Sequence, residues 1–334
     1  MTRDVKPRAP VLGAPDGGAA FIEIAEGESY NGAVSTPRIS GSFLLLLVTA
    51  PLLVGAACER KQTTDTGAIQ AADRAPSGPV DTTPLTGVDA SKLDEGKKKL
   101  FYTLVGSLGS PCGQAQSLRK SVTEETSCKR APFAAKYVLA LVEDEVNEAT
   151  IRETYTAKYE AKTPPPKLDI GKAPRLGNDD APVRLVEFYD YGCGGCKAFK
   201  PILDKILEEY RDKAAAYFLM YPLGKWPDSR SAAQASLAAA QQGKFREMHA
   251  MLFERAPAHN RDAVMGYAKE LGLDVEKFKA AYEAAGPQVD LDHAQGEKSG
   301  IESTPTLFIN DHKFSGPSWR YVGLWIDEEV AVNR

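Results

Sequence analysis

The sequence predicts an α/β fold in its C-terminal half, preceded by a small all-α domain. A nearly continuous apolar run at residues 183–191 leads into an amphipathic helical pattern, and a second apolar run follows at residues 214–223. Continuous apolar runs are typical of strands that are covered on both faces of a sheet. In residues 91–162, by contrast, the apolar positions recur at helical spacings.

Length and composition indicate a globular protein with more than one domain. The chain has 334 residues, of which 43% are hydrophobic, and this length allows about two domains. The formal net charge is only -4. We therefore expect no nucleic-acid partner, because such proteins usually carry a strongly basic surface.

Residues 1–58 are expected to form a signal and lipoprotein region. The segment 43–57 carries no charge and ends in small residues, which suits the apolar part of a signal peptide better than a membrane span. The sequence Leu-Val-Gly-Ala-Ala-Cys that ends at Cys58 resembles a bacterial lipoprotein signal, which predicts that Cys58 is lipidated. An uncleaved N-terminal anchor helix is the alternative. Either interpretation places the rest of the chain in the periplasm or cell envelope, attached to the membrane, where disulfides persist.

The first 37 residues are unusual for a signal peptide because they contain five acidic side chains. We expect translation to begin later, at Val34 read as an alternative start. Arg38 would then supply the positive charge that precedes the apolar segment of a signal peptide.

Four further regions follow from composition and periodicity. Residues 59–90 are rich in small and polar residues and predict a flexible tether. Residues 91–162 predict a domain of three helices, broken at residues 109–111 and restarted near Pro132. Residues 163–173 contain three consecutive prolines and predict a stiff linker. The second domain should span residues 174–334.

Cys112 and Cys128 flank the middle helix expected in the helical domain. A disulfide between them would close a loop of about 15 residues and stabilise the fold by roughly 3 kcal/mol in the chain-entropy model. We interpret this pair as a structural disulfide. A second redox pair that exchanges with other cysteines is the alternative, although the spacing is not C-x-x-C.

Cys193 and Cys196 form a C-x-x-C pair where the strand expected at residues 183–191 ends and a helix begins. The N-terminus of a helix offers unpaired N–H groups and a partial positive charge, both of which stabilise a thiolate. The thiolate is the attacking species in disulfide exchange. We therefore predict a redox-active disulfide in which Cys193 attacks the substrate and Cys196 resolves the mixed disulfide.

The remaining elements continue the α/β pattern. The helix after Cys193 contains Pro201, which should kink it. Residues 229–300 predict a helical block, divided near Gly243, at residues 257–260, and near Gly272 and Gly286, with helices capped by Asn260 and Asp274. Strands are expected at residues 304–310 and 313–315, followed by a helix at residues 321–332.

Several of these motifs together resemble the thioredoxin superfamily, and within it the DsbA-like branch that carries a helical insertion. They are the strand before Cys193-Gly194-Gly195-Cys196, Pro201 in the following helix, and the sequence Ser303-Thr304-Pro305-Thr306, which resembles the cis-proline loop of the family. The residues 243–249 and 267–274 are similar to the insertion of the DsbA-like branch. The resemblance covers roughly residues 174–332 and implies a thioredoxin fold with a helical insertion.

This resemblance also implies a function as a protein thiol:disulfide oxidoreductase. It places Thr304 and Pro305 beside Cys193, where their backbone would bind an extended substrate strand. It assigns Glu187 as a buried acid that relays protons, a role that suits a carboxyl group whose pKa is raised by burial. A carboxylate that points into water at a sheet edge is the alternative for Glu187. The expected substrates are unfolded or cysteine-containing exported proteins, and a membrane redox partner would recycle the enzyme.

The direction of electron transfer stays open at this point. Strong oxidants of the family often carry Pro-His between the cysteines, and thioredoxin carries Gly-Pro, whereas this chain has Gly194-Gly195. We expect an oxidase because of the DsbA-like insertion. A reductase or isomerase of the same fold is the alternative.

A C-x-x-C pair is also compatible with two other classes of function. Cys193 and Cys196 could bind Cu(I) as soft ligands, but no methionine adjoins them, so we expect no metal. A non-redox scaffold with a permanently closed disulfide is the second possibility. The absence of a Gly-rich phosphate loop indicates no nucleotide cofactor. Five aromatic residues could line the cysteine site or belong to the core: Tyr189, Tyr191, Tyr221, Trp226 and Trp319.

Overall fold

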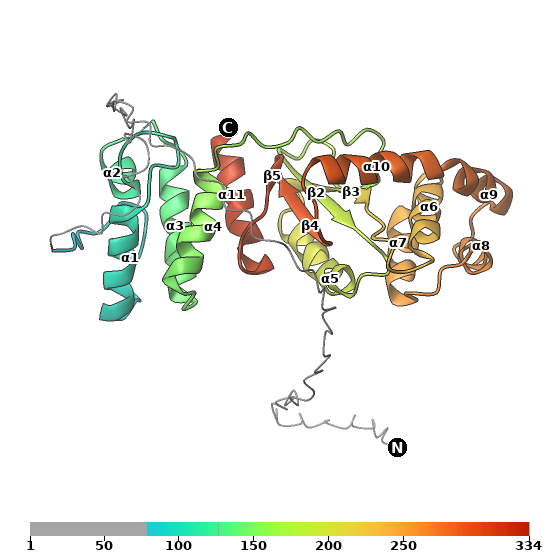
Figure 1. Ribbon diagram of the computed structural model, residues 1–334, viewed down its shortest axis with the longest axis horizontal. Coiled ribbons are helices and arrows are strands. Elements are labelled where there is room, and N and C mark those ends of the chain that lie inside the picture. The colour runs from blue at the N-terminus through green and yellow to red at the C-terminus, as the bar shows by residue number, and fades with distance from the viewer. Residues whose placement is uncertain (1–78, 126, 334) are drawn as a thin grey trace, which may run out of the picture. The chain divides into compact units, whose positions relative to one another are not determined.

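A five-stranded sheet with the strand order β1-β3-β2-β4-β5 forms the centre of the C-terminal part of the chain (Figure 1). The computed structural model describes residues 79–125 and 127–333. The expected signal region, Cys58 and the tether up to residue 78 lie outside this range. The expected fold class, a thioredoxin-like α/β fold with inserted helices after a helical N-terminal region, is confirmed.

The two central strands carry the loops that matter for the site. Strand β2 (Val183–Tyr189) pairs in parallel with β3 (Ala214–Met220) and antiparallel with β4 (Thr306–Ile309). The hairpin partner of β4 is β5 (His312–Lys313). Because β2 and β4 run in opposite directions, the end of β2 lies beside the start of β4. The C-x-x-C loop and the proline loop therefore meet at one edge of the sheet.

Alternation along β2 separates its side chains between two faces of the sheet. Val186 and Phe188 pack into a cluster with Leu168 of the linker, and Gly296 of helix α10 (Gly286–Lys298) lies against Phe188 on that side. Val183 and Leu185 belong to the other cluster, which includes residues of α5 (Gly194–Glu209) and α11 (Val322–Val332). Glu187 shares this second face because it is in phase with Val183 and Leu185.

Strand β1 (Arg175–Gly177) was not expected from the sequence. It pairs antiparallel with β3 at the edge of the sheet. Gly177 has φ +111, and a Cβ there would lie 2.9 Å from the Cα of Ala215. Only glycine suits this position, and a strand of three residues is too short to leave a periodic signal.

The helical insertion follows the predicted breaks closely. It consists of α6 (Ser229–Ala240), α7 (Phe245–Glu254), α8 (Arg261–Glu270), α9 (Val275–Ala284) and α10. The predicted caps are confirmed, since the side chain of Asn260 accepts from the N–H of Ala263 and that of Asp274 from the N–H of Lys277. Gly286 begins α10 instead of ending α9.

The prediction of three helices in residues 91–162 is wrong, because four form: α1 (Glu95–Ser107), α2 (Leu118–Thr123), α3 (Ala131–Glu143) and α4 (Glu148–Tyr159). The third expected helix is divided in two. Glu145 adopts φ 60, which interrupts the helix, and the side chain of Asn147 then caps α4 by accepting from the N–H of Thr150. The apolar spacing continues across this break and conceals it.

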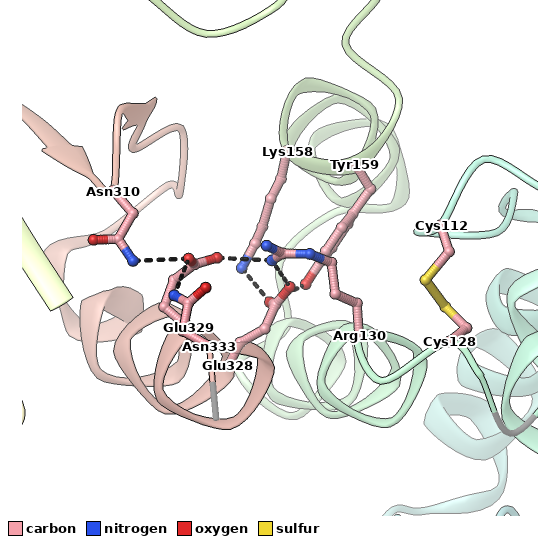
Figure 2. A network of polar contacts seen from close by, with 9 residues as sticks. All are labelled: Cys112, Cys128, Arg130, Lys158, Tyr159, Asn310, Glu328, Glu329 and Asn333. Atoms are coloured by element: carbon pink, nitrogen blue, oxygen red, sulfur yellow. Dashed lines mark hydrogen bonds and ion pairs between the residues drawn. A yellow bond between two sulfur atoms is a disulfide. The ribbon is translucent and has the colours of Figure 1, made fainter. Parts of the chain in front are cut away.

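A buried polar network joins α3 and α4 to α11 within one compact unit (Figure 2). The Arg130 guanidinium donates to Glu328 at 2.6 Å and to Glu329 at 2.7 Å. Glu328 also accepts from Lys158 at 2.5 Å and from the Tyr159 hydroxyl at 2.7 Å. Burial lowers the pKa of Lys158 to about 8, although the adjacent Glu328 opposes this shift.

The same region contributes aromatic contacts. The Lys158 ammonium lies 4.0 Å from the centre of the Trp325 ring, and the Tyr137 and Trp325 rings meet edge to face at 6.4 Å. The four-helix region thus packs closely on the thioredoxin-like part. None of the helices between residues 79 and 333 has both the length and the apolar character needed to cross a membrane.

Candidate active site

Cys193 and Cys196 lie at the junction between strand β2 and helix α5. Cys193 is the N-cap residue of α5, and its N–H donates to the carbonyl oxygen of Asp190 at 3.0 Å. Cys193 is half-buried, whereas Cys196, one turn into the helix, is fully buried. Both cysteines are free thiols in this structure. The arrangement places one accessible sulfur at the positive end of a 16-residue helix.

The environment of Cys193 favours its thiolate. Burial alone would raise the pKa of Cys193, but the Thr304 side chain and the main-chain N–H groups of Cys196 and Gly195 outweigh this effect. The pKa of Cys193 is therefore lower than that of an ordinary cysteine. A lowered pKa increases both the fraction of thiolate and the quality of the sulfur as a leaving group.

Cys196 has the opposite character. Burial raises the pKa of the Cys196 thiol strongly, and the nearby carboxyl group of Glu187 adds to the increase. The two sulfurs of the C-x-x-C pair are therefore unequal. Cys193 is suited to act as a nucleophile and as a leaving group in disulfide exchange, whereas Cys196 is protected from external reagents.

Glu187 lies on β2, beneath the cysteine loop. It is only 2% exposed, so the alternative of a carboxylate that points into water does not describe it. Burial raises the pKa of Glu187 to about 8, and the nearby Asp204 and Cys193 add to this increase while Lys200 opposes it. A carboxyl group with this pKa can exchange protons near neutral pH.

The proline loop faces the cysteines, as the sequence predicts. The Thr304–Pro305 peptide bond is cis, and the Cys193 thiol donates to the Thr304 carbonyl oxygen at 3.3 Å. The Thr304 hydroxyl is buried and has no hydrogen-bond partner among the described residues, yet it lies close enough to lower the pKa of both cysteines. It is available as a donor when a sulfur becomes negative.

The two glycines between the cysteines are not equivalent. A Cβ on Gly194 would meet no atom within 4 Å, whereas a Cβ on Gly195 would lie 3.2 Å from the Cδ of Pro305 and 3.6 Å from the Thr304 oxygen. Gly195 therefore allows the proline loop to approach the C-x-x-C loop closely.

Asp190 was missed from the sequence. It is 2% exposed, and its Oδ1 accepts from the Gly192 N–H at 2.8 Å and from the Ser229 hydroxyl at 2.5 Å. Its Oδ2 accepts from the Leu223 N–H at 2.8 Å. This carboxylate joins the C-x-x-C loop to the loop between β3 and α6. A short acidic side chain at the end of an otherwise apolar strand was the available signal.

The five aromatic residues divide between core and surface. Tyr189, Tyr191 and Tyr221 are buried. The hydroxyls of Tyr189 and Tyr191 lie 2.9 Å apart, and that of Tyr191 lies 3.0 Å from Nδ1 of His249, whose pKa burial lowers to about 3. Trp226 and Trp319 are half-buried.

Cys112 and Cys128 form a disulfide whose Cα atoms are 5.9 Å apart. Cys112 is exposed and Cys128 is buried. The loop that this disulfide closes contains α2. The disulfide lies close to Arg130, whose side chain binds the carboxylates of α11 (Figure 2).

Comparisons with known proteins identify the family of this chain. The sequence profile of a family described as Thioredoxin matches residues 170–328. Disulfide bond formation protein D from Bacillus subtilis is 35% identical over 152 residues, which cover 41% of this chain and 68% of that protein. The chain belongs to the DsbA-like branch of the thioredoxin superfamily.

Two further proteins are similar to about half of this chain or less. The crystal structure of oxidised BdbD from Bacillus subtilis shares 29% identity, covers 50% of this chain and 97% of that chain, and has a TM-score of 0.44. The Na(+)/H(+) antiporter NhaA of Herminiimonas arsenicoxydans is 34% identical over 142 residues, or 42% of this chain. This match spans 22% of the antiporter, so the chain resembles only a part of that protein.

Proposed function

We propose that this DsbA-like chain catalyses dithiol–disulfide exchange with cysteine-containing exported proteins, and that it acts as an oxidase. The observation that carries the proposal is the opposite character of its two thiols. The pKa of half-buried Cys193 is lowered, and that of buried Cys196 is raised. A stabilised Cys193 thiolate favours the dithiol form, so the disulfide form should readily accept electrons.

The reaction starts from the Cys193–Cys196 disulfide. A substrate thiolate attacks the Cys193 sulfur, which forms a substrate–Cys193 bond and expels Cys196 as a thiolate. A second substrate thiolate then attacks the substrate sulfur of this mixed disulfide and expels the Cys193 thiolate. The substrate gains a disulfide, and the enzyme becomes a dithiol. In the reverse direction, Cys193 attacks and Cys196 resolves.

Glu187 would donate a proton to Cys196 or remove one from it, depending on the direction of the reaction. With a pKa of about 8, its carboxyl group is largely protonated at pH 7 and can donate to the departing Cys196 thiolate. In the reverse direction the carboxylate would remove the same proton. A fully buried thiol has no direct access to water, which makes an internal proton carrier useful.

Thr304 and Pro305 would hold the substrate backbone. The Thr304 carbonyl oxygen already accepts a hydrogen bond from the Cys193 thiol, so a substrate bonded to Cys193 would lie beside this loop. An extended segment could add to it by main-chain hydrogen bonds. Cys112–Cys128 has a structural role in this proposal.

The proposed location is the periplasm or cell envelope, with lipid on Cys58 as the membrane anchor. A membrane redox partner would reoxidise the dithiol after each cycle. Cys58→Ser should release the protein from the membrane fraction without changing the redox chemistry of Cys193 and Cys196. Retention of this variant in the membrane fraction would argue against the anchor.

The reduction potential of Cys193–Cys196 tests the function and its direction. The full chain is equilibrated with glutathione buffers, and the redox state of the Cys193–Cys196 peptide is read by mass spectrometry, with Cys193→Ser as the control. A value near -120 mV, roughly that of DsbA, supports an oxidase. A value near -270 mV, roughly that of thioredoxin, means a reductase. A disulfide that never equilibrates would overturn the proposed function altogether.

A further inference from the structure

The loop between β3 and α6 presents apolar side chains beside the C-x-x-C loop. We define it as the 222–227 loop; Pro222 and Trp226 are half-buried, and Pro227 is exposed. Surface loops are commonly polar, and loops that a rigid scaffold positions often carry binding residues. Apart from the exposed Lys225, the side chains of this loop are apolar, and their position next to the accessible cysteine indicates a functional role.

Trp226 is held directly against the backbone that precedes Cys193. A Cβ on Gly192 would lie 2.6 Å from the Cγ and Cδ2 ring carbons of Trp226. Real Cβ atoms do not approach other atoms this closely, so the indole occupies the space that any side chain at position 192 would need. The ring thus lies one residue from the cysteine that bonds to the substrate.

The loop is fixed in this position by buried hydrogen bonds. Asp190 accepts from the N–H of Leu223 and from the hydroxyl of Ser229, one group on each side of Trp226. The same carboxylate accepts from the N–H of Gly192. Asp190 therefore holds Trp226 and the C-x-x-C loop as one unit, and the indole does not have to be ordered when a substrate binds.

The geometry points to Trp226 as a substrate-binding residue that selects polypeptides with an aromatic or large apolar side chain next to the reacting cysteine. This inference rests on the proposed function, since it names the substrate class of the same site. A rigid tryptophan offers a large contact area at low entropic cost. Unfolded exported chains expose such side chains, because their cores have not yet formed.

Pairing between aromatic rings should favour the matching substrate by about 2- to 12-fold in kcat/KM. Two reduced peptides are compared, each with two cysteines, identical except for Phe or Gly beside the first cysteine. The rate at which each peptide reduces Cys193–Cys196 of the full chain is measured by rapid quenching and mass spectrometry. The ratio of the two rates cancels any general change in reactivity.

The wild-type chain should prefer the Phe peptide by about 5-fold, and Trp226→Ala should reduce this ratio to nearly one. Gly192→Ala should reduce it as well, because the new methyl group displaces the indole. The double variant Gly192→Ala/Trp226→Ala should show the same ratio of rates as Trp226→Ala alone, since both changes remove the same contact. Leu291→Ala is the matched control, because Leu291 is 65% exposed and lies beside the Thr163–Pro164 linker.

Two results would overturn the inference: a wild-type ratio near one, or a ratio that Trp226→Ala leaves unchanged. Both can occur while each peptide still reacts, so the proposed function would stand. If neither peptide reduces the wild-type disulfide, the proposed function itself fails. Trp226→Phe guards against misfolding, because it keeps an aromatic ring and should retain most of the preference.

Discussion

The Cys193 sulfur lies 3.3 Å from the main-chain oxygen of Thr304, although 111 residues separate the two along the chain. This contact suits the protonated thiol, because a carbonyl oxygen accepts a hydrogen bond but repels a thiolate. The buried Thr304 hydroxyl, which has no partner among the described residues, can donate to the sulfur once the proton leaves. One residue thus offers an acceptor to the thiol and a donor to the thiolate.

Thr304→Val should raise the pKa of Cys193, because it removes the hydroxyl that stabilises the thiolate. The rate of alkylation by iodoacetamide, followed against pH, gives this pKa directly. Thr304→Ser keeps a hydroxyl and serves as the control. An unchanged profile in the valine variant would mean that the main-chain N–H groups alone stabilise the thiolate.

Glu187→Gln should stabilise the protein at alkaline pH. The folded-state pKa of Glu187 is about 8 against 4.5 for the free acid, so the folded state binds more protons than the unfolded state between these values. Stability must then fall as pH rises. Between pH 5 and pH 8 the wild-type chain should lose about 3 kcal/mol that the variant keeps.

Urea denaturation of both Glu187 forms at the two pH values measures this difference. The variant should also resolve mixed disulfides more slowly, if Glu187 carries the proton of Cys196. Equal pH dependence of stability in the two proteins would contradict the raised pKa.

Gly195→Ala should slow exchange, whereas Gly194→Ala should be nearly neutral. A Cβ at 195 would lie 3.2 Å from Pro305, and one at 194 meets nothing within 4 Å. Small displacements of reacting groups cost rate steeply, so we expect a reduction of about 3-fold or more at 195 alone. Stopped-flow measurement of peptide oxidation compares the two variants, and equal rates would mean that the proline loop moves aside freely.

Lys158→Met should destabilise the protein by about 3–5 kcal/mol, because it leaves Glu328 buried without one of its partners. The side chain of Glu328 is 1% exposed and that of Lys158 6%. Adding Glu328→Gln should recover part of the loss. Arg261→Met breaks an exposed pair with Glu283 and should cost about 1 kcal/mol or less. Urea denaturation measures the free energy of unfolding of each variant. Equal decreases in the Lys158 and Arg261 variants would mean that the buried ion pair is no more important for stability than the exposed one.

The double variant Cys112→Ser/Cys128→Ser should lose about 3 kcal/mol of stability, as expected for a loop of this size, and keep the reduction potential of Cys193–Cys196. Because Cys112 is exposed, the same experiment also tests the alternative of a second redox pair. A changed rate of peptide oxidation in a variant that stays folded at the assay temperature would favour exchange between the two disulfides.

Local patterns were enough to predict most of the fold. The apolar runs, the C-x-x-C spacing and the glycine breaks each depend on neighbours in sequence, and they predicted β2, β3, α5 and the five inserted helices at nearly the right residues. β1 and the break at Glu145 were missed because each changes only a few residues. The site roles of Glu187, Thr304 and the two cysteines stay predictions, although the structure brings these residues together.

Long-range polar contacts could not be predicted from the sequence. Asp190 accepts hydrogen bonds from Leu223 and Ser229, which are 33 and 39 residues away. No local sequence pattern predicts such pairings. The contact between Trp226 and Gly192 also leaves no signal in the sequence, because a glycine before a cysteine is indistinguishable from an ordinary turn residue. Contacts between side chains that are distant in sequence depend on the whole fold, so only the structure shows them.

The network around Arg130 has a consequence for the order of folding during synthesis. Arg130 and its partner Glu328 are 198 residues apart, so a nascent chain has made all four N-terminal helices long before the carboxylates on α11 exist. Until then Arg130 and Lys158 lack the anions that make their burial tolerable. The helical region can reach its final packing only after the thioredoxin-like part is almost complete, so the emerging chain should stay exposed for longer to factors that recognise unfolded proteins.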